Sequence, residues 1–524
     1  MRSVETILFL VLLGTVVAVF AGRLRVPAPS LLVIAGIVAG YLPGIPQVQV
    51  PPHAVSLIVL PPLLYAATDE LPLRDLRAVW RPVVVLAIGL VLASAAAVAA
   101  VASALAAIPV SLAFVLGAVL ASTDPVAVSA LGRRLSLPPK VQALVQGESL
   151  FNDATSLVLF QIAVAIAVGG AATAGSWPIV LLKAAGQFAL LAGGGAVLGA
   201  VVATGIIVVR KRVTDPVLET VIALITPYAA YVLGAVAHVS PVMTVIVTGL
   251  VVGSRRFTIT TPATRLQVHA FYQPVIFLLE SVVFALIGLE LPALIGALAG
   301  SAPWPAIALA VMGTLLAVRI AWVFPLSALS QRRRGPGRLS WPVPAIVTWS
   351  GTRGVVPLAA ALSIPLTASD GSSLPHRDLI LVVTAAVIVL SLVVQGLTLE
   401  PLVRFAGLAT AQDTGAEEAR ARVRLAEVTL ARLDELASDG AAAGDVIERA
   451  RARAEVRLDR DMARLSEAAP PTPPGLTDRD VGRDLIAAES AELGRLFSTG
   501  QIGDGARRRL QHDLDLEATR LRGD

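Results

Sequence analysis

The stretch GESLFNDA at residues 147–154 is a polar segment inside the long apolar part of this chain. It holds two carboxylates, Glu148 and Asp153. Placing an ionisable side chain in a membrane costs about 2.5 to 3.5 kcal/mol on insertion scales. Both side chains therefore need a partner or a function, and the function that we expect is binding of a cation or a proton.

The composition is that of a membrane protein with several spans. Of 524 residues, 56% are hydrophobic and 15% are charged, and the mean hydropathy is +0.77. Residues 1–403 carry a net charge of +9, whereas residues 404–524, with 19 Arg and 23 Asp or Glu, carry −4. The basic excess lies in loops between apolar runs, so it does not indicate a nucleic-acid surface. The absence of cysteine excludes disulfides and thiolate metal sites.

Thirteen apolar runs are long enough to cross a membrane as helices of about 20 residues. The chain is therefore predicted to be an all-α polytopic membrane protein with about 13 transmembrane helices. Residues 7–20 also fit the core of a signal peptide, but Arg23 and Arg25 directly after this run favour a retained span. The runs lie near residues 4–21, 28–46, 53–69, 82–107, 111–131, 142–169, 178–209, 217–237, 240–253, 268–291, 304–329, 342–367 and 378–402.

Basic residues in the loops predict on which side of the membrane each end of the chain lies. Clusters of Arg and Lys follow the odd-numbered spans, whereas the links after even-numbered spans are mostly uncharged. Because basic loops stay in the cytoplasm, we expect the N-terminus outside and the C-terminus in the cytoplasm, in a multi-pass protein of the cell (plasma) membrane. The clusters are Arg23/Arg25, Arg74/Arg77/Arg81, Arg133/Arg134/Lys140, Arg210/Lys211/Arg212, Arg255/Arg256/Arg265 and Arg332/Arg333/Arg334/Arg338.

Residues 405–524 are predicted to form a cytoplasmic helical tail. The composition changes there to Ala, Arg, Glu and Asp, and apolar residues recur with helical spacing over residues 423–436. Prolines at residues 470–474 interrupt this helix, and further helices are expected near 478–497 and 507–522. Solvated helices that pack on each other or on a second copy explain this composition better than a ligand sensor does.

The polar residues of the GESLFNDA stretch share one side of a helix. Ser149 and Asp153 are four residues apart and lie on one face, and Glu148 and Asn152 form the neighbouring stripe. A carboxylate, an amide carbonyl and a hydroxyl are oxygen ligands suited to a hard cation such as Na⁺. The alternative, a hydrogen-bonded patch between helices, accounts for Ser149 and Asn152 but not for two carboxylates.

A second polar motif, STDP at residues 122–125, predicts an interrupted helix in the fifth span. Pro125 has no N–H, so the carbonyl of Ala121 loses its helical partner, and the residue before a proline avoids helical geometry. Carbonyls freed in this way can coordinate an ion if the break lines a cavity. A plain proline kink is the alternative, but the adjacent Asp124 favours an ion site.

The twelfth span carries a comparable motif, GTRGVVP at residues 351–357, where Pro357 frees the carbonyl of Arg353. It lies seven spans after the fifth, and an odd offset reverses direction through the membrane. This is the pattern of inverted repeats whose two broken helices cross near the midplane. Asp124 is then expected to lie near the positive N-terminal helix ends, and Arg353 near the negative C-terminal ones.

One further cation, Arg319, lies within the eleventh span. Its candidate partners are Glu148 and Asp153, and pairing with one leaves the other carboxylate free to take up and release protons. We assign the pair to Glu148, because Asp153 shares its face with Ser149 and is the better member of an ion site.

Together these motifs resemble those of the sodium/proton exchangers of the cation/proton antiporter-1 (NhaP-type) family, over about residues 5–405. The resemblance implies a homodimer and elevator-like movement of a core domain against a dimerisation domain. On this basis residues 1–404 form the transmembrane antiporter domain and 405–524 the tail. Core helices are expected near 82–169 and 304–402, and dimerisation helices near 4–69 and 217–291.

The resemblance also implies roles for single residues. Cation and proton are expected to bind in turn at Asp153. The motif here is Asn152-Asp153, whereas the corresponding motif of electrogenic relatives resembles Asp-Asp, so exchange is expected to be electroneutral. A structural Glu148–Arg319 pair and an Arg353 that steadies the crossed helices are implied as well. The cation and proton site is expected to comprise Asp153, Asp124, Asn152, Ser149 and Thr123, with Na⁺ held by Asp153, Asp124, Ser149 and the carbonyl of Thr123.

The chain departs from this family pattern after the motif LPPLLY at residues 60–65. Many relatives place a carboxylate soon after it, but here Ala66 and Ala67 follow. Asp69 lies one turn further on and offers a substitute through water, although a membrane-surface role for Asp69 and Glu70 fits better. Two more carboxylates stand in the tenth span, Glu280 at a depth where it can line an ion path and Glu290 near an interface.

The expected function is therefore that of a secondary Na⁺(Li⁺)/H⁺ antiporter that uses a proton gradient to expel cytoplasmic sodium, and not that of an enzyme. Its partners are monovalent cations, protons, the lipid bilayer and a second copy, with no resident cofactor and no nucleic acid. A K⁺/H⁺ antiporter is the alternative within the same class. From other classes, a passive cation channel and a non-transporting receptor are alternatives, and the intact polar motifs argue against the receptor.

Overall fold

The computed structural model describes most of the chain and divides it into two compact units, Met1–Ala411 and Gln412–Asp524. We describe each unit by itself. The described residues are 2–24, 28–42, 52–69, 71, 73–124, 138–168, 177–213, 215–260, 262–298, 303–332, 341–368, 372–407, 411–439, 444–465, 478–499 and the single residues 510, 514 and 517.

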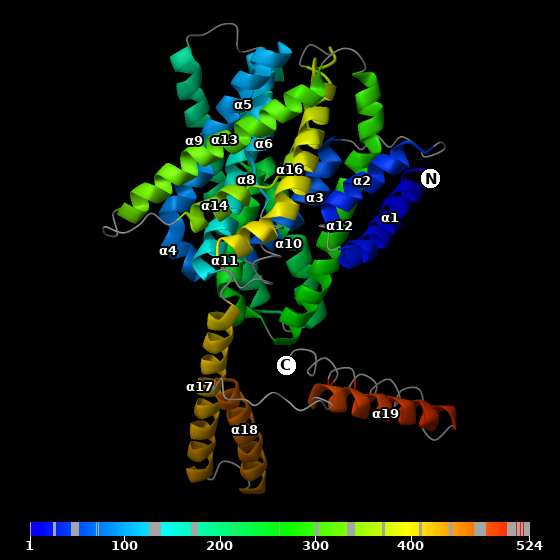
Figure 1. Ribbon diagram of the computed structural model, residues 1–524. Coiled ribbons are helices and arrows are strands. Elements are labelled where there is room, and N and C mark those ends of the chain that lie inside the picture. The colour runs from blue at the N-terminus through cyan, green and yellow to red at the C-terminus, as the bar shows by residue number, and fades with distance from the viewer. Residues whose placement is uncertain are drawn as a thin grey trace. The chain divides into compact units, whose positions relative to one another are not determined.

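The first unit is built from helices (Figure 1). Within the described residues the β structure is limited to an isolated bridge between Thr367 and Ser373. The helices are α1 (Arg2–Leu24), α2 (Ala28–Gly40), α3 (Pro52–Asp69), α4 (Leu73–Val84), the π-helix η1 (Val85–Leu90), α5 (Val91–Ala106), α6 (Val110–Ala121), α8 (Pro139–Val168), α9 (Trp177–Arg210), α10 (Pro216–Val236), α11 (Pro241–Ile259), α12 (Pro262–Ala297), α13 (Trp304–Arg332), α14 (Pro342–Trp349), α15 (Val355–Leu362) and α16 (Arg377–Phe405).

Each of the thirteen predicted runs overlaps one of these helices or a set of helix pieces. Seven described helices are long and apolar enough to cross a membrane, which gives the all-helical polytopic architecture that the sequence predicted. The run near 82–107 is one continuous rod, α4–η1–α5, and the run near 342–367 is broken into α14 and α15. Of the fifth run, α6 and the stretch up to Asp124 are described, and the remainder from Pro125 to residue 131 lies outside the described residues.

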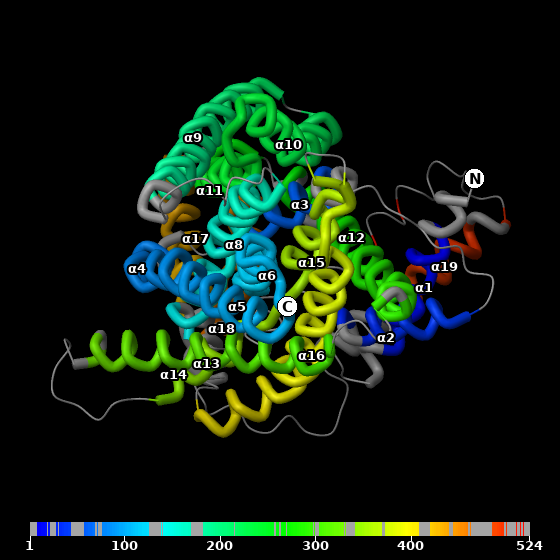
Figure 2. The backbone as a smooth tube through the Cα atoms, turned by 90° about the horizontal axis from the view of Figure 1, so that it is seen from above, coloured from blue at the N-terminus to red at the C-terminus, as the bar shows by residue number. Residues whose placement is uncertain are grey.

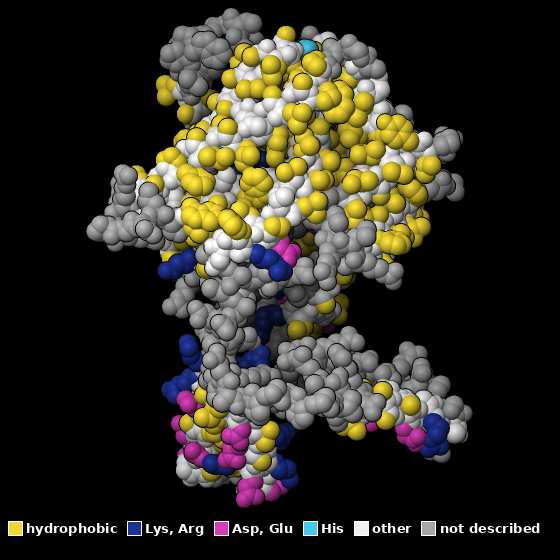
Figure 3. Space-filling model, in the orientation of Figure 1, with side chains coloured by type: hydrophobic (Ala, Val, Ile, Leu, Met, Phe, Trp, Pro, Cys, Tyr) yellow, Lys and Arg dark blue, Asp and Glu magenta, His cyan; other side chains and the backbone are white. Residues whose placement is uncertain are grey.

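The inner and outer helices of this unit differ in burial. Nine of the twelve residues of α6 are buried, and α6 packs against α5, α8, α15 and α16 (Figure 2). Helix α9 instead exposes large apolar side chains, including Leu182 at 75% and Leu190 at 68%. Figure 3 shows hydrophobic side chains spread over the visible face of the unit. An apolar exterior is the surface expected of helices that face lipid tails.

Some of these helices approach so closely that only glycine fits between them. Gly36 of α2 and Gly288 of α12 face each other, and a Cβ added to either would lie 2.9 Å from the Cα of the other. Small residues permit such close packing of transmembrane helices, whose association gains little from the hydrophobic effect in lipid. Helices α2 and α12 therefore form a tight pair, and α12 also packs against α15 and α16.

The second unit contains α17 (Ala411–Ser438), α18 (Gly444–Leu465) and α19 (Asp478–Ser498). The sequence predicted one helix up to the prolines at 470–474, but this helix is divided, with α17 ending at Ser438 and α18 starting at Gly444. An ion pair between Asp434 and Arg451 joins α17 to α18. The prolines and most of the third predicted helix, near 507–522, lie outside the described residues.

Candidate ion-binding site

Two extended stretches of main chain cross where α6 ends and where α14 gives way to α15. The backbone N–H of Asp124 donates to the carbonyl of Thr352 at 2.7 Å, and the Thr352 hydroxyl donates to the carbonyl of Asp124, also at 2.7 Å. Polar main-chain groups without a helical partner are costly at membrane depth. The end of α6 and the break between α14 and α15 thus satisfy polar groups of each other, as expected from the two motifs, and the continuation of the fifth span after Asp124 lies outside the described residues.

The charged residues at the crossing face helix ends of opposite sign. Arg353 donates from Nη1 to the carbonyl of Ser122 at 2.5 Å, directly after the C-terminal end of α6. Asp124 lies against Gly354, the N-cap residue of α15, so closely that a Cβ at Gly354 would overlap its carboxylate. Cations are favoured at helix C-termini and anions at N-termini. Arg353 and Asp124 therefore match the polarity of the helices that they meet.

The polar stripe of α8 meets the other side of the α6 end. Ser149 donates from its hydroxyl to the carbonyl of Thr123 at 2.5 Å. Asn152 donates from Nδ2 to the Thr123 hydroxyl at 2.6 Å and accepts the Thr123 N–H at 3.3 Å. All of these side chains are buried. Ser149, Asn152 and Thr123 are thus brought together, as the helical spacing and the motif at residues 122–125 predicted.

Asp153 lies one helical turn beyond Ser149 on α8, with 7% of its surface exposed. Its Oδ1 accepts a hydrogen bond from the Ser122 hydroxyl. The charges of Asp124 and Arg353 both act on the Asp153 carboxylate. Since a carboxylate has about four lone-pair positions, the contact with Ser122 leaves it able to bind a further proton or cation.

Arg319 of α13 and Glu148 of α8 form a buried ion pair. Nη1 of Arg319 is 2.6 Å from Oε1 of Glu148, and Nη2 is 2.9 Å from Oε2. The two side chains are 4% and 1% exposed. Arg319 also donates to the carbonyls of Val347 and Thr348 at the end of α14, at 2.8 and 3.1 Å. It therefore joins α8 to the broken helix, and the second carboxylate of α8, Asp153, lies outside this pair.

Three residues at the crossing were not predicted as site members: Ser122, Thr352 and Ser391. The first two belong to the motifs that were quoted, and their place beside Asp124 and Arg353 in the sequence was the available signal. Ser391 of α16 accepts the backbone N–H of Arg353 at 2.9 Å, and no motif marks it.

Two of the other carboxylates that the sequence singled out lie on a different helix. Glu280 and Glu290 lie on α12 (Pro262–Ala297). The Asp69 side chain and Glu70 lie outside the described residues.

Comparison with known proteins places this geometry in a family. The profile of the family described as "Sodium/hydrogen exchanger, transmembrane" matches residues 7–405. An uncharacterized Na⁺/H⁺ exchanger of Mycobacterium tuberculosis is 33% identical over 527 residues, which cover 98% of this chain and 96% of that protein. The "sodium, potassium, lithium and rubidium/H(+) antiporter" of Bacillus subtilis is 29% identical over 70% of this chain and 56% of that protein.

A solved structure has the same fold. The sodium proton antiporter MjNhaP1 of Methanocaldococcus jannaschii aligns with a TM-score of 0.62 over 77% of this chain and 99% of that chain, at 18% sequence identity. This similarity supports the architecture, and the sequence match over the whole transmembrane unit supports common descent. The chain is therefore a member of the sodium/hydrogen exchanger family of membrane antiporters.

Proposed function

We propose that this chain exchanges Na⁺ or Li⁺ for H⁺ and that both ions bind at Asp153. The observation that carries the proposal is the convergence of oxygen atoms at the helix crossing. Ser149 keeps its lone pairs while donating to Thr123, and the Thr123 carbonyl can accept from a second direction. With the carboxylates of Asp153 and Asp124, these atoms supply the oxygen ligands that a hard cation needs.

Competition for one carboxylate gives obligatory exchange. A proton or a cation on Asp153 neutralises the charge that burial makes unfavourable, and occupancy by one excludes the other. The neighbouring side chain, Asn152, is a neutral amide hydrogen-bonded to Thr123, so it adds no further charge to those of Asp153 and Asp124. One carboxylate per cycle then carries either one Na⁺ or one H⁺, and the exchange is electroneutral.

The transport movement is that of an elevator between two domains of a homodimeric protein. The residues at the crossing come from α6, α8, α13, α14, α15 and α16, which all belong to the predicted core at about 82–169 and 304–402. The predicted dimerisation helices, at about 4–69 and 217–291, include the tight α2–α12 pair. That the described site residues come from one set of helices supports a core that moves as a body against fixed partners. The loop charges support a plasma-membrane protein with its N-terminus outside and its tail in the cytoplasm.

K⁺/H⁺ exchange is the second candidate. It is favoured by the name of the Bacillus subtilis relative, which includes potassium and rubidium with sodium and lithium. Both candidates use the same carboxylate and the same crossing. Selectivity depends on small differences in ligand spacing, so the ion has to be established by measurement.

Asp153→Asn tests the proposal in everted membrane vesicles, with Na⁺, Li⁺ or K⁺ added to an imposed pH gradient. We expect the wild-type chain to release the gradient with Na⁺ and Li⁺, and Asp153→Asn to abolish this release. Asp215→Asn is the matched control, because Asp215 caps the N-terminus of α10 away from the site and asparagine is an equally good cap. Retained exchange in Asp153→Asn would refute the assignment, and release with K⁺ but not Na⁺ would select the second candidate.

A further inference from the structure

Ser391 makes an unusual contact for a hydroxyl in a transmembrane helix. Such hydroxyls commonly donate to a carbonyl of their own helix, as Thr204 does to Ala200 and Thr314 to Ala310 in this chain. Ser391 of α16 is fully buried and instead contacts another segment, since its Oγ accepts the backbone N–H of Arg353 at 2.9 Å. This N–H belongs to the unwound stretch before α15, where no helical carbonyl is available to it.

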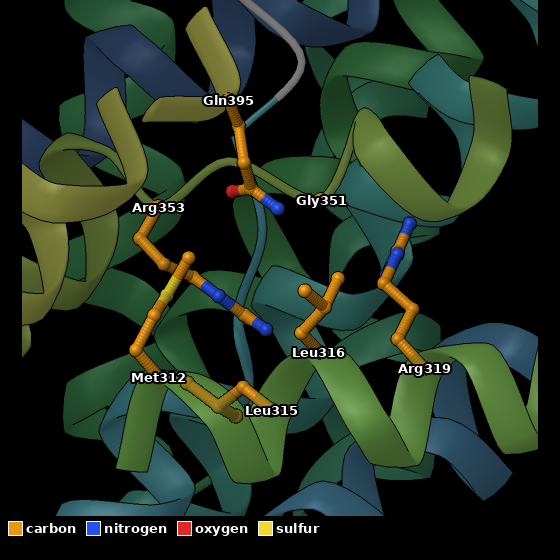
Figure 4. Close-up of a pocket in the computed structure, with 7 residues that line it drawn as sticks. All are labelled: Met312, Leu315, Leu316, Arg319, Gly351, Arg353 and Gln395. Atoms are coloured by element: carbon orange, nitrogen blue, oxygen red, sulfur yellow. The ribbon is translucent and has the colours of Figure 1, made fainter. Parts of the chain in front are cut away.

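Gln395 continues this contact one turn along α16. The Ser391 hydroxyl donates to Oε1 of Gln395 at 2.7 Å, so both functions of the hydroxyl are used. The Gln395 side chain, 3% exposed, lines a cavity of about 10 Å³ together with Arg353, Gly351 and residues of α13. Figure 4 shows Gln395 and Arg353 on adjoining sides of this space, with Arg319 on the far side. The cavity has room for about one water molecule.

These hydrogen bonds reach the ion site by two routes. Fixing the main chain at Arg353 fixes the neighbouring Thr352, whose hydroxyl and carbonyl hold Asp124 at 2.7 Å each. It also fixes the position of the Arg353 Cα and thereby of the Arg353 side chain, which donates to the carbonyl of Ser122. Ser122 in turn donates to Asp153. Ser391 therefore touches none of the proposed ligands, yet the positions of both site carboxylates depend on the segment that it holds.

We propose that Ser391 and Gln395 are positioning residues for cation binding, which hold the unwound stretch of the crossed helix in the conformation that places Asp124 and Asp153. The inference rests on the proposed function, because it concerns the affinity of that same site. Loss of the hydrogen bond lets the stretch relax, so the apparent KM for Na⁺ rises. A merely structural role predicts a different result, with fewer folded molecules and a lower maximal rate at unchanged KM.

The test uses the full chain reconstituted in liposomes, with exchange followed by a pH-sensitive dye over a range of Na⁺ concentrations. For Ser391→Ala we expect a KM about two- to tenfold higher, the range given by one hydrogen bond, with a maximal rate per folded protein within about twofold of wild type. Ser391→Thr keeps the hydroxyl and should restore the KM. Ser281→Ala is the matched control, because Ser281 is a buried serine of α12 whose hydroxyl has no hydrogen-bond partner within the described part of the chain.

A second variant keeps the test decisive if Ser391→Ala does not fold. Gln395→Met preserves side-chain length and leaves Ser391 in place, and we expect a smaller rise in KM than for Ser391→Ala. An unchanged KM in the folded Ser391 or Gln395 variants, or an equal rise in Ser281→Ala, would overturn the inference. Asp153→Asn, measured alongside, separates the two proposals: exchange retained there refutes the assigned site, whereas the KM of the Ser391 variant decides only the positioning role.

Discussion

Removing one partner of the Glu148–Arg319 pair should damage the protein more than removing both. The pair has two close nitrogen–oxygen contacts, of 2.6 and 2.9 Å, and its side chains are 1% and 4% exposed. Breaking a buried pair from one side leaves an uncompensated charge and costs about 3 to 5 kcal/mol. Replacing both partners by apolar residues of similar size removes this penalty.

The hydrogen bonds of Arg319 to the α14 carbonyls set the order of the variants. Arg319→Met removes the donors to Val347 and Thr348 and leaves the Glu148 charge without its partner. We therefore expect the free energy of unfolding to fall by more than about 4 kcal/mol, the middle of the range for a broken buried pair. Glu148→Leu leaves Arg319 bonded to both carbonyls, which places its cost at the lower end, about 3 kcal/mol. The double variant strands no charge and loses only the two carbonyl contacts, a cost of about 2 kcal/mol.

The free energy of unfolding can be measured for all three variants by titrating mixed micelles with SDS and following helical circular dichroism. Glu400→Gln is the control, since its ion pair with Arg404 is exposed and should contribute less than about 1 kcal/mol. The same variants assayed for Na⁺ exchange should follow the same order. A double variant that loses as much stability as the two single variants combined would show that the charges are not coupled, and the structural role assigned to this pair would be wrong.

Two further predictions concern the crossing and the tail. Gly354→Ala places a methyl group where the Asp124 carboxylate lies, so exchange per folded protein should fall at least tenfold, about the effect of 1.4 kcal/mol. The control is Gly313→Ala, at a helical site with nothing within 4 Å, which should leave the exchange rate unchanged. Asp434→Ala breaks the exposed pair with Arg451 and should change the unfolding free energy of the tail by less than about 1 kcal/mol, which a thermal melt of the full chain can check.

The helices could be predicted because a bilayer leaves the chain few alternatives. Each spanning segment must satisfy its own backbone hydrogen bonds, so apolar runs of sufficient length become helices. The position of the break between α14 and α15 was harder to predict from the sequence. Pro357 suggested it, but this proline lies in the first turn of α15, where its missing N–H has no helical partner to lose. The chain is unwound earlier, up to Gly354, where close contact with Asp124 requires glycine.

The candidate site was predictable where spacing on one helix defines it. Ser149 and Asp153 share a face of α8 by the helical period alone, and a lone arginine in an apolar span had few possible partners. The role of Ser391 was not predictable in this way. A serine in an apolar helix commonly donates its hydroxyl to a carbonyl of the same helix. Only the packing of α16 against the unwound stretch brings another donor, the Arg353 N–H, within reach of Ser391.

Connectivity at the crossing also limits how the protein can move. Arg353 is bonded through its main chain to α16 and through its side chain to the end of α6, where Ser122 donates to Asp153 of α8. A movement that separated any two of these helices would break buried hydrogen bonds in a medium that offers no replacement. Alternating access is therefore less costly if these helices move together and sliding takes place at their outer, apolar faces. These shared hydrogen bonds favour the proposed elevator over a gate that opens within the crossing itself.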